Sequence, residues 1–210
     1  MDYIIWDFNG TILDDVKAGI DSVNTLLHDR GMREISGVEE YRQVFRFPIK
    51  GYYERIGFDF DKEPYEVIAP LWVEQYLKNV KDSTVYCDVM DTLEFFKAKG
   101  IKQIILSATE REMLNKQLSE LEISQYFEEI LGLDNIHANS KEGLAKRWRD
   151  EHKDVRALLI GDTDHDRDVA AAIDAECVLV CRGHQSREYL EGFGARTFDN
   201  LIQMREAIFE

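Results

Sequence analysis

Five short apolar segments, separated by helical patterns, constrain the fold of this chain most strongly. Most are continuous rather than alternating in polarity, which is typical of parallel strands covered by helices on both faces. The predicted strands span Tyr3–Asp7, Lys102–Ser107, Glu129–Leu131, Ala157–Gly161 and Cys177–Cys181, with a weaker sixth at Ala195–Phe198. This alternation of strands and helices predicts an α/β fold with a doubly wound parallel sheet and right-handed crossovers.

The predicted helices carry boundary signals of their own. The helix expected at Asp88–Lys99 is followed by a glycine, which favours helix termination. The helix expected at Glu110–Leu121 follows Thr109, and the helix expected at Lys141–His152 follows Ser140. Because hydroxyl side chains are preferred at helix starts, Thr109 and Ser140 are predicted to be N-cap residues.

The interval from about residue 14 to residue 85 interrupts the alternation, because none of its segments has a good strand pattern. An apolar stripe in steps of three and four residues predicts a helix at its start. The stripe consists of Leu13, Val16, Ile20, Val23 and Leu27. All three prolines of the chain and eight aromatic residues from position 41 to position 65 also fall in this interval. We therefore predict a helical domain at 14–85, with its own aromatic core, inserted into a core domain of 1–13 and 86–210.

Polar side chains follow three of the predicted strands. They are Asp7, Asn9 and Thr11 after the first strand, Ser107 after the second, and Asp162 and Asp166 after the fourth. Lys141 opens the helix between the third and fourth strands. Because open α/β sheets bind ligands beyond the carboxyl ends of their strands, we expect these side chains to converge at one edge. Hard carboxylate oxygens of this kind suit Mg²⁺.

Four short motifs identify the chain with a known family. They are Asp-Phe-Asn-Gly-Thr at 7–11, Ile-Ile-Leu-Ser at 104–107, Ser-Lys at 140–141 and Gly-Asp-Thr-Asp-His-Asp at 161–166. In this order, with a helical insert between the first two, they resemble the haloacid dehalogenase (HAD) superfamily in its phosphoglycolate phosphatase-like and β-phosphoglucomutase-like branch. The resemblance covers essentially the whole chain. It implies a Rossmann-like core, an α-helical cap at 14–85, and a Mg²⁺-dependent hydrolase of small phosphorylated metabolites.

The resemblance also implies roles for individual residues. Asp7 would be the nucleophile that attacks phosphorus in line and forms an aspartyl-phosphate. Mg²⁺ would be held by the Asp7 carboxylate, the Asn9 backbone carbonyl and Asp162, with Asp166 ligating directly or through water. Lys141 would neutralise charge on the nucleophile and the phosphate together. The residues expected to position or contact the phosphate or the rest of the substrate are Thr11, Ser107, Ala108, Arg46 and Lys50.

Asn9 departs from the family pattern. The phosphatases of the family carry an aspartate at this position, which protonates the leaving oxygen and later activates water. An amide can do neither, and loss of a general acid–base typically costs about 10²–10⁴ in rate. The penalty is smallest for leaving groups that are weak bases, and Asn9→Asp is expected to raise the rate on an alkyl phosphate. His165 is a possible substitute acid or base, although a histidine beside carboxylates is more often an ordinary loop residue.

Two other functions remain open at this stage. The chain could be a weakly catalytic or non-catalytic sensor of phosphate ligands on the same scaffold. It could also resemble phosphonoacetaldehyde hydrolases, which lack the second aspartate and use a cap lysine as a Schiff-base amine, with Lys50 as the candidate. Dehalogenation of carbon–halogen bonds needs no metal site, so Asp162 and Asp166 argue against it.

Charge and cysteine content restrict partners and location. The chain has 210 residues, with 26 Lys plus Arg against 41 Asp plus Glu, a net charge of −15. Such a surface repels nucleic acids and anionic membranes, so we expect neither as a partner. We expect the protein to be a monomer or a weak dimer. Cys177 and Cys181 would lie about 13 Å apart along one strand, too far for a disulfide. No signal peptide or membrane-length apolar run is apparent, so a cytoplasmic location is expected.

Overall fold

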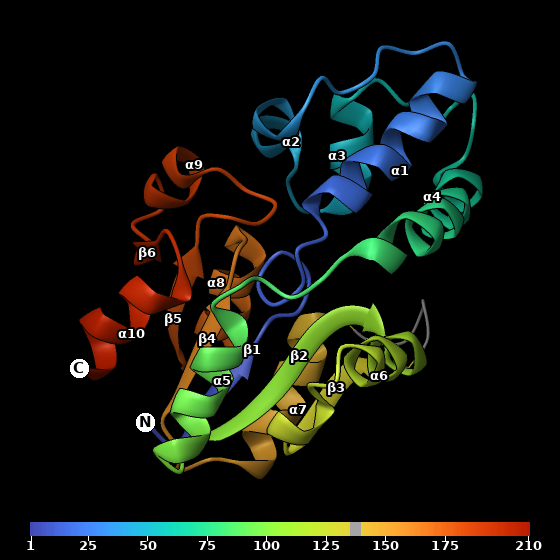
Figure 1. Ribbon diagram of the computed structural model, residues 1–210. Helices are drawn as coiled ribbons and strands as arrows, with labels where there is room; N and C mark the ends of the chain where they lie inside the picture. The colour runs from blue at the N-terminus through green and yellow to red at the C-terminus, as the bar shows by residue number, and fades with distance from the viewer. Residues whose placement is uncertain (135–139) are drawn as a thin grey trace.

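The protein is described here by a computed structural model that covers residues 1–134 and 140–210. Six parallel strands form one sheet in the order β3-β2-β1-β4-β5-β6 (Figure 1). The strands are β1 (Tyr3–Trp6), β2 (Lys102–Glu110), β3 (Glu129–Leu133), β4 (Ala157–Gly161), β5 (Glu176–Val180) and β6 (Thr197–Phe198). The chain starts in the middle of the sheet and builds outward in both directions, so the doubly wound parallel fold predicted from the sequence is confirmed.

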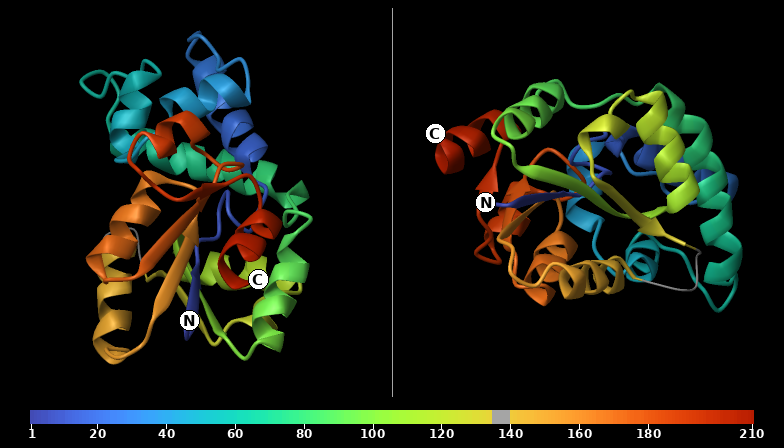
Figure 2. Two further views of the ribbon diagram at one scale, coloured as in Figure 1. Left: turned by 90° about the vertical axis from the view of Figure 1, so that its left-hand side faces the viewer. Right: turned by 90° about the horizontal axis from the view of Figure 1, so that it is seen from below.

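Helices cover both faces of the sheet (Figure 2). Those of the core are α5 (Val89–Ala98), α6 (Arg111–Glu120), α7 (Lys141–Glu151), α8 (Asp164–Ala172), α9 (Arg187–Glu191) and α10 (Leu201–Phe209), with a short 3₁₀ helix at Ser124–Tyr126. The side chains of β1 alternate between the faces, because successive residues of a strand point to opposite sides. Ile4 and Trp6 pack with α5, α6 and α10, whereas Tyr3 and Ile5 pack with α7 and α8. Within 1–134 and 140–210, no helix has the length and apolar character needed to cross a membrane.

The boundaries of the elements differ from the sequence prediction by a few residues. β1 ends one residue early, β5 starts and ends one residue early, β3 is two residues longer, and β6 covers two residues. β2 continues to Glu110, so the prediction that Thr109 is the N-cap of α6 was wrong. Instead the Glu110 carboxylate accepts hydrogen bonds from the backbone N–H groups of Glu112 (3.0 Å) and Met113 (2.9 Å). The predicted N-cap Ser140 is confirmed, since its hydroxyl accepts from Gly143 N at 3.1 Å.

A helical insert separates β1 from α5. It consists of α1 (Val16–Asp29), α2 (Val38–Val44), α3 (Ile49–Arg55), α4 (Tyr65–Asn79) and a 3₁₀ helix at Val80–Asp82. Much of the predicted apolar stripe packs with buried aromatic residues into a cluster of the insert's own. Figure 1 shows that the insert lies beyond the carboxyl ends of the central strands.

Two connecting segments, one entering and one leaving the insert, join it to the core, and they run side by side. Asp14 N donates to Thr84 O at 2.9 Å, and Tyr86 N donates to Ile12 O at 3.0 Å. These hydrogen bonds bring the entry and the exit of the insert together. The two covalent connections between insert and core therefore lie together, near the end of β1.

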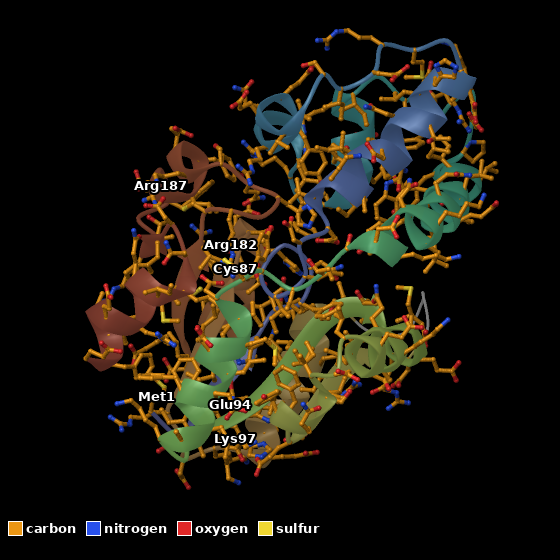
Figure 3. The ribbon with its side chains drawn as sticks, viewed as in Figure 1. Met1, Cys87, Glu94, Lys97, Arg182 and Arg187 are labelled. Carbon is orange, nitrogen blue, oxygen red and sulfur yellow. The ribbon has the colours of Figure 1, made fainter. Side chains whose placement is uncertain are left out.

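A buried ion pair fixes the exit from the insert. The Arg182 guanidinium, labelled in Figure 3, donates to Asp88 Oδ1 at 2.6 Å and to Thr11 O at 3.1 Å. The other oxygen of Asp88 accepts from Leu201 N at 2.8 Å. One carboxylate thus joins the start of α5, the loop after β5 and the start of α10.

We expect Asp88→Ala to lower the free energy of unfolding by about 3 kcal/mol, because it leaves a largely buried guanidinium without its carboxylate partner. Asp91→Ala, at an exposed position of the same helix, should change it by less than about 1 kcal/mol. Urea denaturation followed by circular dichroism measures both. Equal losses in the two variants would show that the Asp88–Arg182 pair does not stabilise the fold.

Candidate active site

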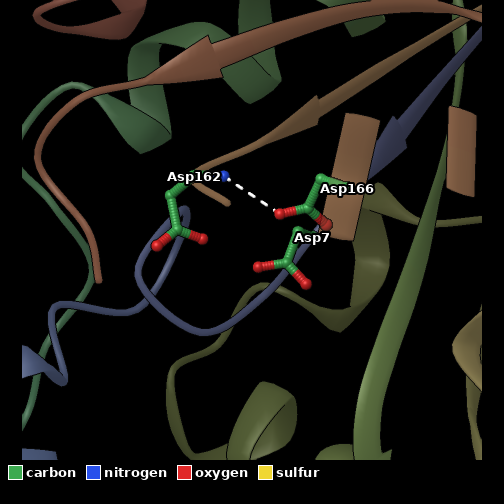
Figure 4. Close-up of side chains that lie close together, drawn as sticks. All are labelled: Asp7, Asp162 and Asp166. Carbon is green, nitrogen blue, oxygen red and sulfur yellow. Dashed lines mark hydrogen bonds between the residues drawn. The ribbon is translucent and has the colours of Figure 1, made fainter. Parts of the chain in front are cut away.

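Three aspartates meet at the carboxyl edge of the sheet (Figure 4). Asp7 follows β1, Asp162 follows the neighbouring strand β4, and Asp166 lies in the first turn of α8. Each offers a carboxylate oxygen within 4.8 Å of the others, and all three residues are buried. The convergence expected from the sequence is therefore present for these three side chains.

Lys141 lies between two of these carboxylates. It is the first residue of α7 and is buried, and its ammonium donates to both Asp7 and Asp166. The second oxygen of Asp166 accepts from Thr163 N (3.0 Å) and Thr163 Oγ1 (2.7 Å) at the start of α8. Asp166 is thus held on both sides, whereas Asp7 keeps one carboxylate oxygen that Lys141 does not contact.

Asp162 is held by two loops. Thr11 Oγ1 donates to one of its oxygens at 3.2 Å, and the backbone N–H of His184 donates to the other at 2.6 Å. Glycines make this approach possible, because a Cβ atom at Gly10 or Gly183 would lie only 2.4 or 2.0 Å from Asp162 Oδ2. The loop after β5 therefore belongs to the site as much as the motif loop after β1 does.

Burial and mutual repulsion shape the charges of the cluster. Burial raises the pKa of Asp7 well above its usual range, and the neighbouring aspartates add to this effect while Lys141 opposes it. Burial also raises the pKa of Asp162 to about 6. Burial acts in the same direction on Asp166, but its ion pair with Lys141 outweighs burial and lowers the pKa.

The donor set fits a divalent cation. Three carboxylates face one ammonium, so the cluster carries surplus negative charge in a buried place, where uncompensated charge is costly. Carboxylate oxygens are the ligands that Mg²⁺ takes, usually with several waters retained.

The side chain of Asn9 is fully engaged in hydrogen bonds. Its Nδ2 donates to Asp15 Oδ2 at 2.9 Å and to Tyr76 Oη at 2.8 Å, and its Oδ1 accepts from Thr109 Oγ1 at 2.8 Å. Tyr76 in turn donates to the same oxygen of Asp15 at 2.5 Å. The amide therefore joins the core to α4 of the insert, and a carboxylate at position 9 would lie directly against the carboxylate of Asp15.

Asp15 and His184 form an ion pair that sequence reasoning missed. His184 Nε2 lies 3.3 Å from Asp15 Oδ1, and its Nδ1 contacts Tyr41 Oη of α2 at 2.9 Å. Burial disfavours the charged imidazole, but Asp15 and the nearby Asp162 outweigh it and raise the pKa of His184 to about 9. Burial would raise the pKa of Asp15, yet His184 and its other partners lower it. The available signal for His184 was its place after a fifth parallel strand, at the same edge of the sheet.

Ser107 and Ala108 lie at an irregularity of β2. The register with β3 shifts between Leu106 and Glu110, and such bulges are frequent beside active sites. Ser107 is buried, its oxygen accepts from Thr109 N at 3.1 Å, and its hydroxyl hydrogen has no acceptor among residues 1–134 and 140–210. Ala108 is exposed at the same turn.

The structure does not bring the two predicted substrate cations to the aspartates. The guanidinium of Arg46 lies 3.3 Å from the ring centre of Tyr189 and donates to Arg42 O at 2.8 Å. The ammonium of Lys50 lies 5.2 Å from the ring centre of Phe60, inside the insert. Each cation thus packs on an aromatic ring, and Arg46 is also bonded to a carbonyl of α2. The substrate contacts expected for Arg46 and Lys50 stay predictions.

His165 stacks against the insert, with its ring 4.6 Å from that of Phe47. Burial and the ammonium of Lys141 lower the pKa of His165. Its neutral form is therefore favoured near pH 7, which makes it a poor proton donor. Two further aspartates of α8 differ from each other: Asp168 is exposed, whereas Asp164 accepts from Tyr189 Oη at 2.8 Å.

Comparison with known proteins identifies the family. The sequence profile of the haloacid dehalogenase-like hydrolases matches residues 4–180. The chain belongs to this family. It is 26% identical to phosphoglycolate phosphatase 1 of Pseudomonas aeruginosa over 94% of this chain and 76% of that protein. It is also 26% identical to the phosphoglycolate phosphatase of Aquifex aeolicus, over 88% of this chain and 86% of that protein. The resemblance found in the sequence is thereby confirmed, and the chain is a HAD-type hydrolase.

Solved structures show the same fold along the entire chain. A haloacid dehalogenase-like hydrolase from Streptococcus pneumoniae aligns with a TM-score of 0.83 and 18% identity, covering 100% of this chain and 99% of that one. Protein tyrosine kinase A from Mycobacterium tuberculosis aligns with a TM-score of 0.82 and 18% identity, covering 100% and 98%. Proteins with such different names share this architecture, so function must be argued from the site.

The His184–Asp15 pair predicts a pH dependence of stability. The pKa of His184 is raised on folding, from about 6.5 to about 9, so its contribution is complete below pH 6.5 and is lost as the pH rises through 9. We expect His184→Gln to remove a contribution of roughly 3 kcal/mol that the parent loses between these pH values. Denaturation at several pH values in the presence of a chelator measures it. Parallel curves for parent and variant would contradict the assignment.

Proposed function

We propose that this HAD-type hydrolase is a Mg²⁺-dependent phosphatase of small phosphorylated metabolites, similar in reaction to phosphoglycolate phosphatases. The observation that carries the proposal is the buried ammonium of Lys141, shared by Asp7 and Asp166 beside Asp162. A buried cation next to a carboxylate with a free oxygen suits attack on an anionic phosphoryl group. Two relatives named phosphoglycolate phosphatase add support for this substrate class.

The first step would be phosphoryl transfer to Asp7. The carboxylate oxygen that Lys141 does not contact attacks phosphorus, a P–O bond to Asp7 forms, and the P–O bond to the leaving group breaks. Lys141 would oppose the effect of burial on the pKa of Asp7 and neutralise phosphoryl oxygens, and Ser107 would donate its hydroxyl hydrogen to one of them.

Asp7, the Asn9 carbonyl and Asp162 would hold Mg²⁺, with Asp166 directly or through water, and the cation would neutralise charge on the phosphoryl group. Thr11 positions Asp162 in this arrangement through its hydroxyl.

The second step would be hydrolysis of the aspartyl-phosphate. Water attacks phosphorus, the P–O bond to Asp7 breaks, and inorganic phosphate leaves with the carboxylate restored. Asn9 can neither protonate the leaving oxygen in the first step nor remove a proton from water in the second. Solvent must supply the proton of the first step and accept the proton of the second, so good leaving groups should react fastest.

The insert, residues 14–85, would act as a cap that covers the site and excludes water during the transfer. The net charge of −15 favours small metabolites over polyanions as substrates. A cytoplasmic location would keep the three cysteines, which form no disulfide, in their reduced state.

One observation favours a second candidate function. The amide of Asn9 is held by hydrogen bonds to Asp15, Tyr76 and Thr109 and cannot transfer protons. A site of this kind would bind a phosphate ligand while hydrolysing it slowly. A phosphate-ligand sensor on the HAD scaffold would then fit. C–P bond hydrolysis through Lys50 gains no support, because its ammonium lies over Phe60.

We expect hydrolysis of p-nitrophenyl phosphate and phosphoglycolate that requires Mg²⁺ and is abolished by chelation. Asp7→Asn should lose at least about 10³-fold in kcat, because the amide is not a nucleophile. Asp168→Asn, an exposed position, is the matched control and should retain parental kinetics. The rate of phosphate release, with and without Mg²⁺, is measured for the parent, Asp7→Asn and Asp168→Asn. Absence of turnover together with tight phosphate binding would favour the sensor, and unchanged activity of Asp7→Asn would exclude it as the nucleophile.

The contacts of Asn9 change the expectation for restoring an acid–base residue. Asn9→Asp alone should give little gain on an alkyl phosphate, because the new carboxylate faces Asp15. The double variant Asn9→Asp/Asp15→Asn keeps the charge and reverses the direction of the hydrogen bond. It should raise the alkyl phosphate rate by about 10²-fold or more, and the p-nitrophenyl phosphate rate less.

Steady-state kinetics on both substrates test this prediction, with Asp15→Asn alone as the control. If Asn9→Asp by itself produces the full gain, the Asp15 contact does not restrict position 9. If the double variant shows no gain, another group already supplies the proton.

A further inference from the structure

One arginine of the insert donates hydrogen bonds to the core loop that follows β5. Arg42, in α2, donates from Nε to Gly183 O at 2.8 Å and from another nitrogen of its guanidinium to Arg182 O. It thereby holds two consecutive carbonyl groups of the core. A planar guanidinium can form such a fork, whereas a lysine ammonium lacks its fixed geometry.

The residues that Arg42 holds are those that hold Asp162. Gly183 O accepts a hydrogen bond from Arg42, and the N–H of the next residue, His184, donates to Asp162 Oδ2 at 2.6 Å. Gly183 itself packs so closely on Asp162 that a Cβ atom would lie 2.0 Å from the same oxygen. A shift of this short segment would therefore displace a hydrogen bond and a packing contact of Asp162.

An open pocket lies beside Arg42 and the residues that flank the segment, Cys181 and Ser186. Its volume is about 440 Å³, and it lies between α2 and the loop. It is lined by Glu39, Arg42, Gln43, Cys181, Ser186, Arg187, Glu188 and Asp199. Because packing does not fill the space beside Arg42, its hydrogen bonds to Arg182 O and Gly183 O contribute to holding the segment to α2.

Other contacts keep the insert in place when Arg42 is removed. Tyr41 Oη contacts His184, Arg46 stacks on Tyr189 of α9, and Phe47 stacks on His165 of α8. Loss of the Arg42 hydrogen bonds should thus loosen the loop without detaching the insert.

We propose that Arg42 is a positioning residue that couples docking of the insert to the order of the divalent-cation site, by holding Gly183 and His184 against Asp162. The inference rests on the proposed function, because it takes Asp162 to be a ligand of the cation. The coupling is reciprocal: docking of the insert strengthens cation binding, and a bound cation favours the docked insert.

The test is the affinity for Mg²⁺ without substrate, measured by isothermal titration calorimetry on the whole chain. Arg42→Ala should raise the Kd by about 10–100-fold, as is typical when partners of metal ligands are removed. Arg42→Lys, which keeps one donor group, should lie between parent and Arg42→Ala. At saturating Mg²⁺, kcat of Arg42→Ala should return to within about threefold of the parent, because no group of the reaction is removed.

Arg55→Ala is the matched control. Arg55 also donates from its guanidinium to two carbonyls, those of Val44 (3.0 Å) and Arg46 (3.2 Å), but both lie within the insert. It should bind Mg²⁺ as the parent does. Circular dichroism verifies folding, and Arg42→Lys carries the test if Arg42→Ala does not fold.

The outcomes separate the two proposals. A parental Kd in Arg42→Ala, or an equal rise in Arg55→Ala, overturns the coupling and leaves the phosphatase proposal intact. A parent that does not bind Mg²⁺ overturns both. Hydrolysis by the parent without Mg²⁺ overturns the metal dependence, whatever the affinities.

Discussion

The sharing of one buried ammonium by two carboxylates is the interaction on which the rest of this site depends. Without Lys141, Asp7, Asp162 and Asp166 would place three negative charges within a few ångströms in a buried region. The parallel sheet makes this arrangement possible, because β1 and β4 are neighbours and end at the same edge. The fold brings the three carboxylates together, and the ammonium of Lys141 offsets part of the repulsion between them.

A second ion pair, His184–Asp15, lies beside the three aspartates and connects them to the insert. His184 pairs with Asp15 while its backbone N–H holds Asp162, and Tyr41 and Tyr76 of the insert bond to the two members of that pair. The insert is therefore joined to the core by polar groups at the edge of the site, and not by apolar packing alone. Movement of the insert and the charge balance of the site are physically linked.

Local patterns explain which features could be predicted from the sequence. The strands, most helix limits and the motif residues Asp7, Lys141 and Asp162 follow from apolar runs and from polar residues at strand ends, which are properties of neighbouring positions. The His184–Asp15 pair joins loops far apart in the chain and shows no periodicity, so only tertiary structure reveals it. The positions of Arg46 and Lys50 could not be predicted from the sequence, because a long cationic side chain can either pack on an aromatic ring or extend toward a ligand.

Under the proposed function, the charge of the site also couples the binding of cation and phosphate. Four buried carboxylates, counting Asp15, face the two cations Lys141 and His184, so a phosphate dianion would enter a region that is already negative. A divalent cation removes this surplus and turns repulsion into attraction. Cation and phosphate should therefore bind cooperatively, each raising the affinity for the other by the same factor. The acidic surface, with its net charge of −15, strengthens this requirement, because only a site neutralised from within can hold a small anion on such a protein.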